Sequence, residues 1–160
     1  MRFSIALLPC LLLVAGCMPG PIAKPLPKWQ PPADVPRYGD WVVEPDACVL
    51  QAGSGDVQAE TDGRLSGQLI PIKISFLMPL VRPPLVTMSG LPVPLPLDGS
   101  SYTFRTYVEY SPRTVAHMND VGTFVVVNYQ PLNTTQPREV HFDTRGLMQG
   151  IAHVSKVCGK

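Results

Sequence analysis

Proline is concentrated in two segments of this chain, which limits where regular secondary structure can form. The chain has 19 prolines among 160 residues, with seven in residues 18–36 and six in residues 78–97. Because proline lacks a backbone N–H and fixes φ, it interrupts helices and is excluded from central strands. We therefore expect the folded part of the chain to follow the first segment, and no central strand within the second.

The N-terminus has the pattern of an export signal. Arg2 provides a positive start, and residues 4–15 are almost wholly apolar. A stretch of about a dozen residues is too short to cross a hydrocarbon core of about 30 Å as a helix. Its length is typical of the apolar region of a secretory signal peptide. We expect this region to direct the chain out of the cytoplasm.

The apolar region ends in Val14-Ala15-Gly16-Cys17, which resembles the lipobox of bacterial lipoproteins. The resemblance implies that residues 1–16 are removed and that Cys17 carries acyl chains on its sulfur and its new amine. Several acyl chains are enough for stable membrane anchoring. Met18, rather than Asp, follows the cysteine, and this favours the outer membrane, facing the periplasm. The alternative is an ordinary signal peptide with an incidental cysteine.

Residues 17–37 read as the lipidated cysteine and a proline-rich tether, and residues 38–160 as a β-rich domain. A proline-rich stretch favours polyproline II at about 3.1 Å per residue, so the tether could reach roughly 60 Å. A semi-rigid spacer is the simplest interpretation. A ligand for a proline-binding partner is the alternative, and Trp29 among the prolines gives it mild support.

The domain shows the alternation of apolar and polar residues that is typical of strands. We expect strands within residues 39–44, 47–51, 68–76, 101–110, 122–130 and 138–143. Residues 52–63 read as a loop, and Pro71 marks its segment as an edge strand. Lys73 and Arg105 fall on the polar faces of their strands. The prediction is a mainly β fold of about six or seven strands, either an antiparallel β-sandwich or an open barrel.

The C-terminal residues change to a helical period. Spacings of four, three and four form one apolar stripe, made by Leu147, Ile151, Val154 and Cys158. Asp143 or Thr144 could cap the start of this helix, and Gly159 could close it. Gly146 and Gly150 lower the helix propensity, so packing must stabilise the helix.

Two cysteines remain once Cys10 leaves with the signal and Cys17 takes the lipid. In an oxidising compartment, Cys48 and Cys158 are expected to form a disulfide between the second strand and the last helical turn. A metal pair or two free thiols are the alternatives, although Cys48 has no nearby cysteine or histidine to help bind a metal.

Residues 38–44, Tyr-Gly-Asp-Trp-Val-Val-Glu, and 48–51, Cys-Val-Leu-Gln, resemble the opening of invasion-associated locus B-type periplasmic proteins. Residues 142–147 are similar to the closing segment of that family. The resemblance implies a secreted β-rich domain and supplies no catalytic residues. This chain departs from the family at Pro45, where an early cysteine is usual.

Residues 78–97 contain one charge, Arg82, among leucine, valine, methionine and proline. One possibility is a connection that covers the core. The other is an exposed apolar surface, formed by Leu91, Val93, Leu95 and Leu97, that docks on a protein partner or on lipid.

Chemical motifs are scarce. The three histidines, His117, His141 and His153, form no metal-ligand motif, and we expect no metal and no cofactor. His141 and His153 are expected to be solvated. The net charge of +1 excludes nucleic-acid binding driven by a basic surface.

We expect a lipid-anchored, non-enzymatic component of an envelope assembly, such as a secretion, pilus or surface complex, with an envelope protein as partner. The alternative is a periplasmic domain that binds a small ligand or inhibits an enzyme.

Overall fold

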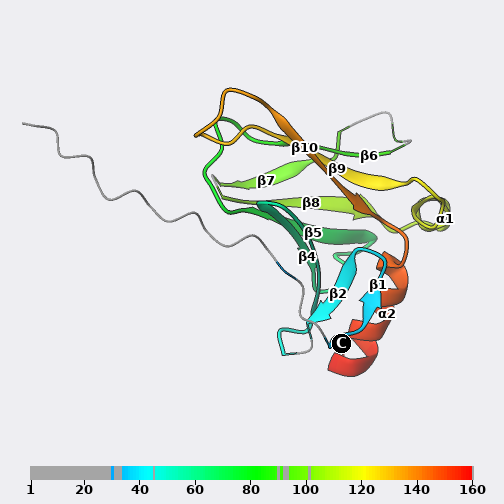
Figure 1. Ribbon diagram of the computed structural model, residues 1–160. Coiled ribbons are helices and arrows are strands. Elements are labelled where there is room, and N and C mark those ends of the chain that lie inside the picture. Colours follow the sequence, from blue (N-terminus) through cyan, green and yellow to red (C-terminus); the bar gives the residue numbers. More distant parts are fainter. Residues whose placement is uncertain are drawn as a thin grey trace, which may run out of the picture.

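The computed structural model describes residues 30, 34–44, 46–89, 91, 94–100 and 102–159. The expected signal peptide, Cys17 and most of the tether lie outside these residues. The described chain is mainly β, with ten strands and two helices (Figure 1). The predicted β class and C-terminal helix are therefore confirmed, with more strands than the expected six or seven. None of its described helices is long and apolar enough to span a membrane.

Seven strands form the larger sheet, in the order β1-β2-β3-β4-β5-β8-β7, and all neighbouring pairs are antiparallel. Their bounds are β1 Arg37–Tyr38, β2 Trp41–Glu44, β3 Val49–Ser54, β4 Val57–Thr61, β5 Leu69–Phe76, β7 Leu97–Ser100 and β8 Thr103–Glu109. The first five strands form a meander. The sheet then continues from β5 to β8, because β6 belongs to the second sheet.

The smaller sheet has the order β10-β9-β6 and is also antiparallel. It consists of β6 Leu85–Met88, β9 Phe124–Tyr129 and β10 Arg138–Asp143. The predicted central position of β9 is confirmed. Val125 and Val127 are fully buried.

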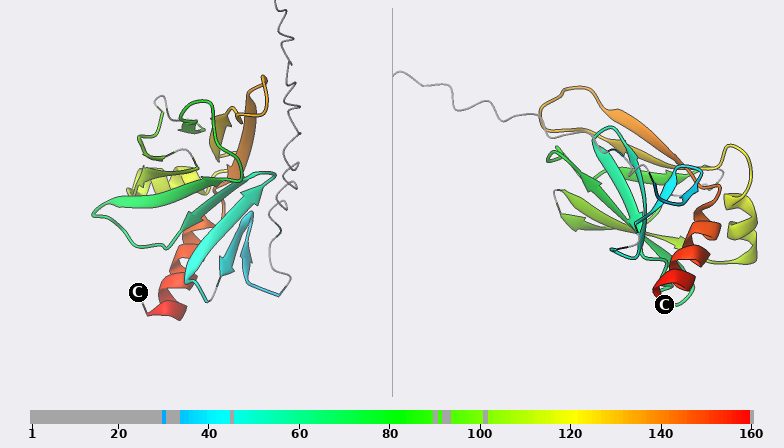
Figure 2. Two further views of the ribbon diagram at one scale, coloured as in Figure 1. Left: turned by 90° about the vertical axis from the view of Figure 1, so that its left-hand side faces the viewer. Right: turned by 60° about the horizontal axis from the view of Figure 1, so that its bottom comes forward.

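One face of the seven-stranded sheet is covered, and the other, on which Val42 of β2 is still buried, is open over β4, β5 and β8. Helix α2, Leu147–Cys158, contacts β1, β2 and β3. The three-stranded sheet lies towards the other end (Figures 1 and 2), where the Phe76 and Tyr129 rings lie 5.2 Å apart between centroids. The core between these layers contains Ile70, Ile72 and Ile74, each fully buried. The alternate residues of β5 therefore point to the uncovered face.

The expected loop at residues 52–63 is wrong, because these residues form most of a hairpin between β3 and β4. Ser54 pairs with Val57, which leaves Gly55 and Asp56 as a two-residue turn. Gly55 has a φ of 62°, a conformation that favours glycine. The glycine and aspartate that suggested a loop therefore mark a tight turn.

The expected edge position of the Pro71 strand is also wrong, since β5 lies between β4 and β8. The ladder between β4 and β5 runs only from Lys73 to Phe76, so Pro71 lies beyond its end. On the other side Pro71 pairs with Tyr107 of β8. An interior strand tolerates this proline because no β4 residue is paired with it.

Helix α2 follows the predicted stripe. Leu147, Ile151 and Val154 are buried. The predicted side-chain cap is wrong: the N-cap is Gly146, with a φ of 83° and no side-chain bond. The Thr144 hydroxyl instead lies 2.8 Å from the Met118 carbonyl oxygen. Gly159 closes the helix as predicted, with a φ of 63°.

Helix α1, Pro112–Met118, was not expected. Ser111 caps it by accepting a hydrogen bond from the Thr114 amide at 3.2 Å, and Pro112 begins the first turn. Only Met118 of this helix is buried. The sequence therefore contains no apolar stripe from which the helix could be predicted.

Candidate functional site

The predicted cysteine pair is present. Cys48 and Cys158 are bonded, and their Cα atoms lie 6.0 Å apart. Cys48 directly precedes β3, and Cys158 is the last residue of α2. The bond fixes the end of the helix to the covered side of the large sheet. Cys17, the predicted lipid attachment site, lies outside the described residues.

The predicted docking residues occupy different environments. Leu91 is 39% exposed, whereas Leu95 and Leu97 are partly buried and pack against the core. The Leu95 amide donates to the Val86 carbonyl at 2.8 Å, which places this part of the segment beside β6. Val93 lies outside the described residues. The described part of the segment thus combines core contacts with one exposed leucine.

Two histidines were expected to be solvated, and the expectation is wrong for His153. Its Nδ1 lies 2.6 Å from the Tyr38 hydroxyl in a half-buried contact that joins β1 to α2. His141 is exposed, and its Nε2 lies 2.5 Å from Glu139 Oε1. This hydrogen bond lowers the pKa of the Glu139 carboxyl. In the described part of the chain, no three metal-ligating side chains are grouped as a metal site would require.

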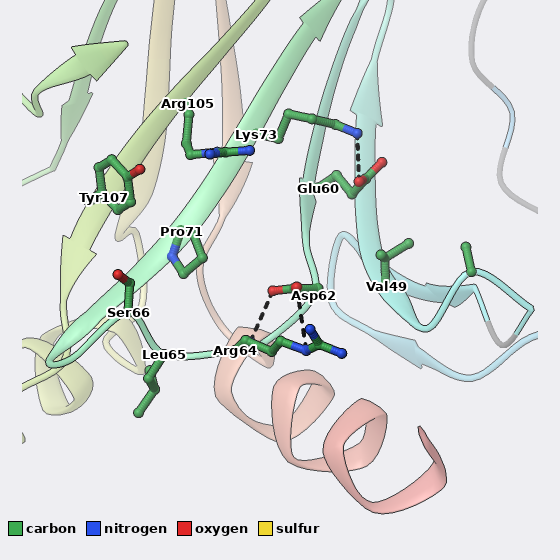
Figure 3. A pocket seen from close by; sticks show the side chains of 11 residues that line it. Val49, Glu60, Asp62, Arg64, Leu65, Ser66, Pro71, Lys73, Arg105 and Tyr107 are labelled. Carbon is green, nitrogen blue, oxygen red and sulfur yellow. Dashed lines mark hydrogen bonds and ion pairs between the residues drawn. The ribbon is translucent and has the colours of Figure 1, made fainter. Parts of the chain in front are cut away.

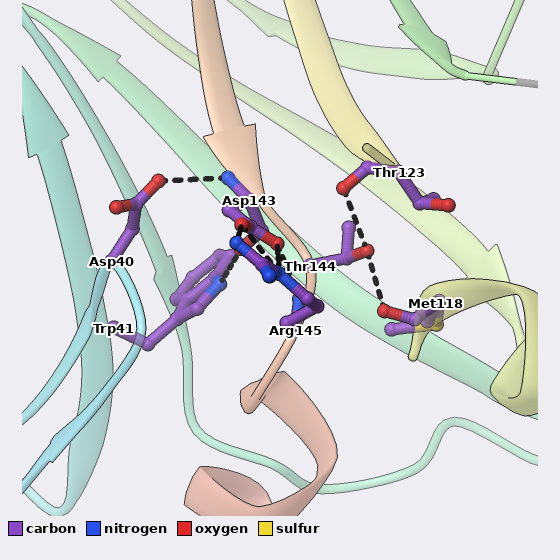
Figure 4. Close-up of polar contacts among 7 residues, drawn as sticks. All are labelled: Asp40, Trp41, Met118, Thr123, Asp143, Thr144 and Arg145. Atoms are coloured by element: carbon purple, nitrogen blue, oxygen red, sulfur yellow. Dashed lines mark hydrogen bonds and ion pairs between the residues drawn. The ribbon is translucent and has the colours of Figure 1, made fainter. Parts of the chain in front are cut away.

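The segment after β10 forms a polar junction with the start of β2 (Figure 4). The Trp41 indole N–H donates to the Asp143 carbonyl at 2.7 Å, and the Asp143 amide donates to Asp40 Oδ2 at 2.8 Å. Arg145 donates hydrogen bonds to the Asp143 carboxylate. These bonds lower the pKa of Asp143. The Trp41 and Asp40 bonds hold two distant segments together, and the Arg145 bonds fix the Asp143 carboxylate within its own segment. We interpret the junction as structural.

An open groove of about 610 Å³ lies on the uncovered face of the seven-stranded sheet (Figure 3). Its floor comes from β4, β5 and β8, and the loop between β4 and β5 forms one wall. The lining residues are Ala47, Val49, Glu60, Asp62, Arg64, Leu65, Ser66, Pro71, Lys73, Arg105 and Tyr107. The groove combines charged side chains of both signs with one aromatic ring.

The charges of the groove are ordered by strand register. Glu60 of β4 is opposite Lys73 of β5, which is opposite Arg105 of β8, which is opposite Asp98 of β7. The Lys73 ammonium lies 2.7 Å from Glu60 Oε1. On the wall of the groove, Asp62 accepts a hydrogen bond from the Arg64 amide at 3.0 Å. Three cations therefore line the groove with two carboxylates.

The groove can bind but shows no catalytic arrangement that we can assign. The Arg105 and Lys73 side chains can donate hydrogen bonds to a ligand, and Glu60 and Asp62 can accept them. Among the described lining residues, none is a histidine or cysteine that could act as base or nucleophile. Its chemistry is that of polar recognition beside an aromatic surface.

Comparison with family models, curated proteins and solved structures gives no match for this chain.

Sequence reasoning placed Lys73 and Arg105 on polar strand faces but did not bring them together. The side-chain period shows which face a residue occupies and contains no information on which strands pair. The long alternating pattern of both strands could have suggested that the two strands pair, since such strands need partners on both sides. Their 32-residue separation in the chain made this pairing one choice among several.

Proposed function

We propose that this chain is a lipid-anchored protein of the bacterial cell envelope, and that its β-rich domain is a non-enzymatic binding module. The anchor is supported by the lipobox-like Val14-Ala15-Gly16-Cys17 after a short apolar region. The proline-rich residues 18–36 would hold the domain up to roughly 60 Å from the lipid. An outer-membrane position facing the periplasm is supported by Met18 after the cysteine.

The binding role is supported chiefly by the groove on the uncovered sheet face. An open sheet face of a soluble protein can simply be exposed to solvent and have no binding role. This face is hollowed and carries charged side chains in an ordered row. Ligand sites are concave and combine a few polar groups with aromatic or apolar surface. Tyr107, Pro71 and the charged side chains meet that description.

The anchor is tested by metabolic labelling with a fatty-acid analogue. The Cys17→Ser variant should lose the label, because the thiol that accepts the lipid is gone. Cys10→Ser is the matched control, since Cys10 lies within the expected signal peptide and should leave with it. Label retained in Cys17→Ser, or lost in Cys10→Ser, would contradict the assignment.

The binding role is tested by crosslinking in cells. A photo-reactive residue in place of Ser66, on the groove wall, should capture an envelope component. The same residue in place of Gln149, which is exposed on α2, provides the control for random collisions. Equal capture from both positions would count against a binding site in the groove.

A further inference from the structure

The groove contains two cations in directly opposed positions. Lys73 of β5 and Arg105 of β8 are register partners, and both lie on the uncovered face, since their neighbours Ile72, Ile74 and Phe104 are buried. Opposed residues of antiparallel strands have Cβ atoms about 4.5–5.5 Å apart, and like charges there destabilise the sheet. The fold alone does not require this pair.

The carboxylates of the groove balance this pair only in part. Glu60 forms an ion pair with Lys73. None of the described residues forms a side-chain hydrogen bond or ion pair with the Arg105 guanidinium. Asp98 is opposite Arg105 on the other side, but Figure 3 shows the guanidinium extending over β5 towards Lys73. The Lys73 ammonium at the far end of its side chain is turned away from the guanidinium to Glu60 (Figure 3). The guanidinium is therefore the cation of the groove that its carboxylates leave unpaired, and an anion beside it would be stabilised.

We propose that this groove binds an acidic saccharide, and that Arg105 and Lys73 hold its carboxylate. The inference rests on the proposed function of the domain as a binding module. A carboxylate matches the planar donor fork of arginine, which can bind both of its oxygens, while lysine adds a compact positive charge. Binding would give the Arg105 guanidinium the anionic partner that the groove itself does not supply, and the Lys73 ammonium would turn from Glu60 towards the same anion.

The surroundings of the cations suit a sugar ring. Tyr107 is two residues from Arg105 on the same face and is the register partner of Pro71, so both rings line the groove beside the Arg105 side chain. These two rings are the platform on which a sugar ring could pack. Glu60 lies on the other side of Lys73 from Tyr107, and Asp62 lies beside Arg64 on the wall of the groove (Figure 3). Each carboxylate has about four acceptor sites, so both can accept hydrogen bonds from sugar hydroxyls in addition to their present partners.

The strand positions favour a saccharide over a peptide. Peptides that bind sheets commonly add a strand to an exposed edge and form main-chain hydrogen bonds. The groove lies over β4, β5 and β8, which are interior strands. Only the first half of β5, around Pro71, has no partner on β4, and proline has no backbone N–H to offer a peptide. Recognition here would come chiefly from side chains, which offer donors and acceptors for carboxylates and hydroxyls.

The test uses the full mature lipoprotein in detergent and ligand-observed NMR. The probe is trigalacturonate, and maltotriose is the neutral sugar control. Trigalacturonate should bind and maltotriose should not. Affinity should fall about tenfold in Arg105→Gln, because a charge-assisted hydrogen bond contributes at least that factor. Arg113→Gln, at an exposed position of α1, is the matched control and should bind like the wild type.

Four outcomes would overturn the proposal: no binding of trigalacturonate, equal binding of triglutamate, equal binding of acetate, or unchanged affinity in Arg105→Gln. Triglutamate represents an acidic peptide, and acetate represents an unspecific anion site. A thermal melt checks that Arg105→Gln is folded. If crosslinking at Ser66 captures a partner while trigalacturonate does not bind, the proposed binding function survives and the saccharide assignment fails.

Discussion

Gly150 offers a sharp test of how helix α2 is packed on the large sheet. Gly150 is buried within the helix, and a Cβ atom added there would lie 2.7 Å from both δ-methyl groups of Leu50. The Leu50 Cγ atom would be 3.3 Å away. Rotation about χ2 of Leu50 leaves that Cγ contact in place, and Leu50 is fully buried, with little room to move. We therefore expect Gly150→Ala to destabilise the protein.

The magnitude follows from two opposing effects. Alanine is favoured over glycine in a helix interior by about 1 kcal/mol. Overpacking a buried contact typically costs about 1–3 kcal/mol. The net loss in the free energy of unfolding should be about 1 kcal/mol, which lowers Tm by roughly 3 °C in a protein of this size. In a Leu50→Ala background the contact is removed, and Gly150→Ala should then stabilise the protein by about 1 kcal/mol.

Urea unfolding of the four members of this double-mutant cycle measures the coupling between the two positions, which should be about 2 kcal/mol. Ala152→Gly, at an exposed position of the same helix, calibrates the glycine effect within α2 itself. If Gly150→Ala stabilises the wild-type protein as much as Ala152→Gly destabilises it, then helix α2 does not pack on Leu50 as described.

Three further outcomes are expected. Replacing Cys48 and Cys158 with alanine should lower the free energy of unfolding by up to about 5 kcal/mol in the chain-entropy model, because the bond spans 110 positions; thiol labelling of the unreduced wild type should find neither cysteine. Burial and the neighbouring carboxylate raise the pKa of Tyr129 to about 12, so its proton is bound more tightly in the folded state. Stability should therefore fall as pH rises from 10 to 12, and Tyr129→Phe should lose less stability over that interval in thermal melts. A double-mutant cycle of Lys73 and Arg105 should give a repulsive coupling of roughly 0.2–1 kcal/mol that shrinks at 1 M salt; an attractive coupling would contradict their opposed placement.

Local sequence patterns were informative where one face of an element is buried. The alternation in β8 and β10 and the stripe of α2 each follow from contact with a single core. Short elements were harder to predict from the sequence. Helix α1 buries only Met118, and the β3–β4 turn consists of glycine and aspartate, which also occur in loops. In both cases the identity of the element depends on tertiary pairing that a local window does not contain.

The candidate groove shows the same limit at the level of function. The sequence shows which side of each strand is polar. The groove, however, exists only because β8, and not β6, is the neighbour of β5 in the larger sheet. Residues 78–97 interrupt that continuity in sequence, and their prolines prevent most of the segment from pairing as a central strand. After β5 the chain forms β6 in the smaller sheet and then returns to the larger sheet. For this reason β8 pairs with β5, and Arg105 is opposite Lys73.

The edge at which the proposed tether would join the domain also bears on how the groove would work. The described chain enters the large sheet at β1, which is one edge, and the groove lies over β4, β5 and β8. Three to five interstrand spacings of about 4.8 Å separate them, roughly 15–24 Å along a flat path across the sheet. With the proposed anchor at Cys17, the domain would attach to the membrane at β1, so the groove would stay clear of the attachment edge because the two are different surfaces. This arrangement would suit a ligand fixed elsewhere in the envelope: the length of the proposed tether would limit how far the groove reaches, and the side chains of the sheet would determine what it binds.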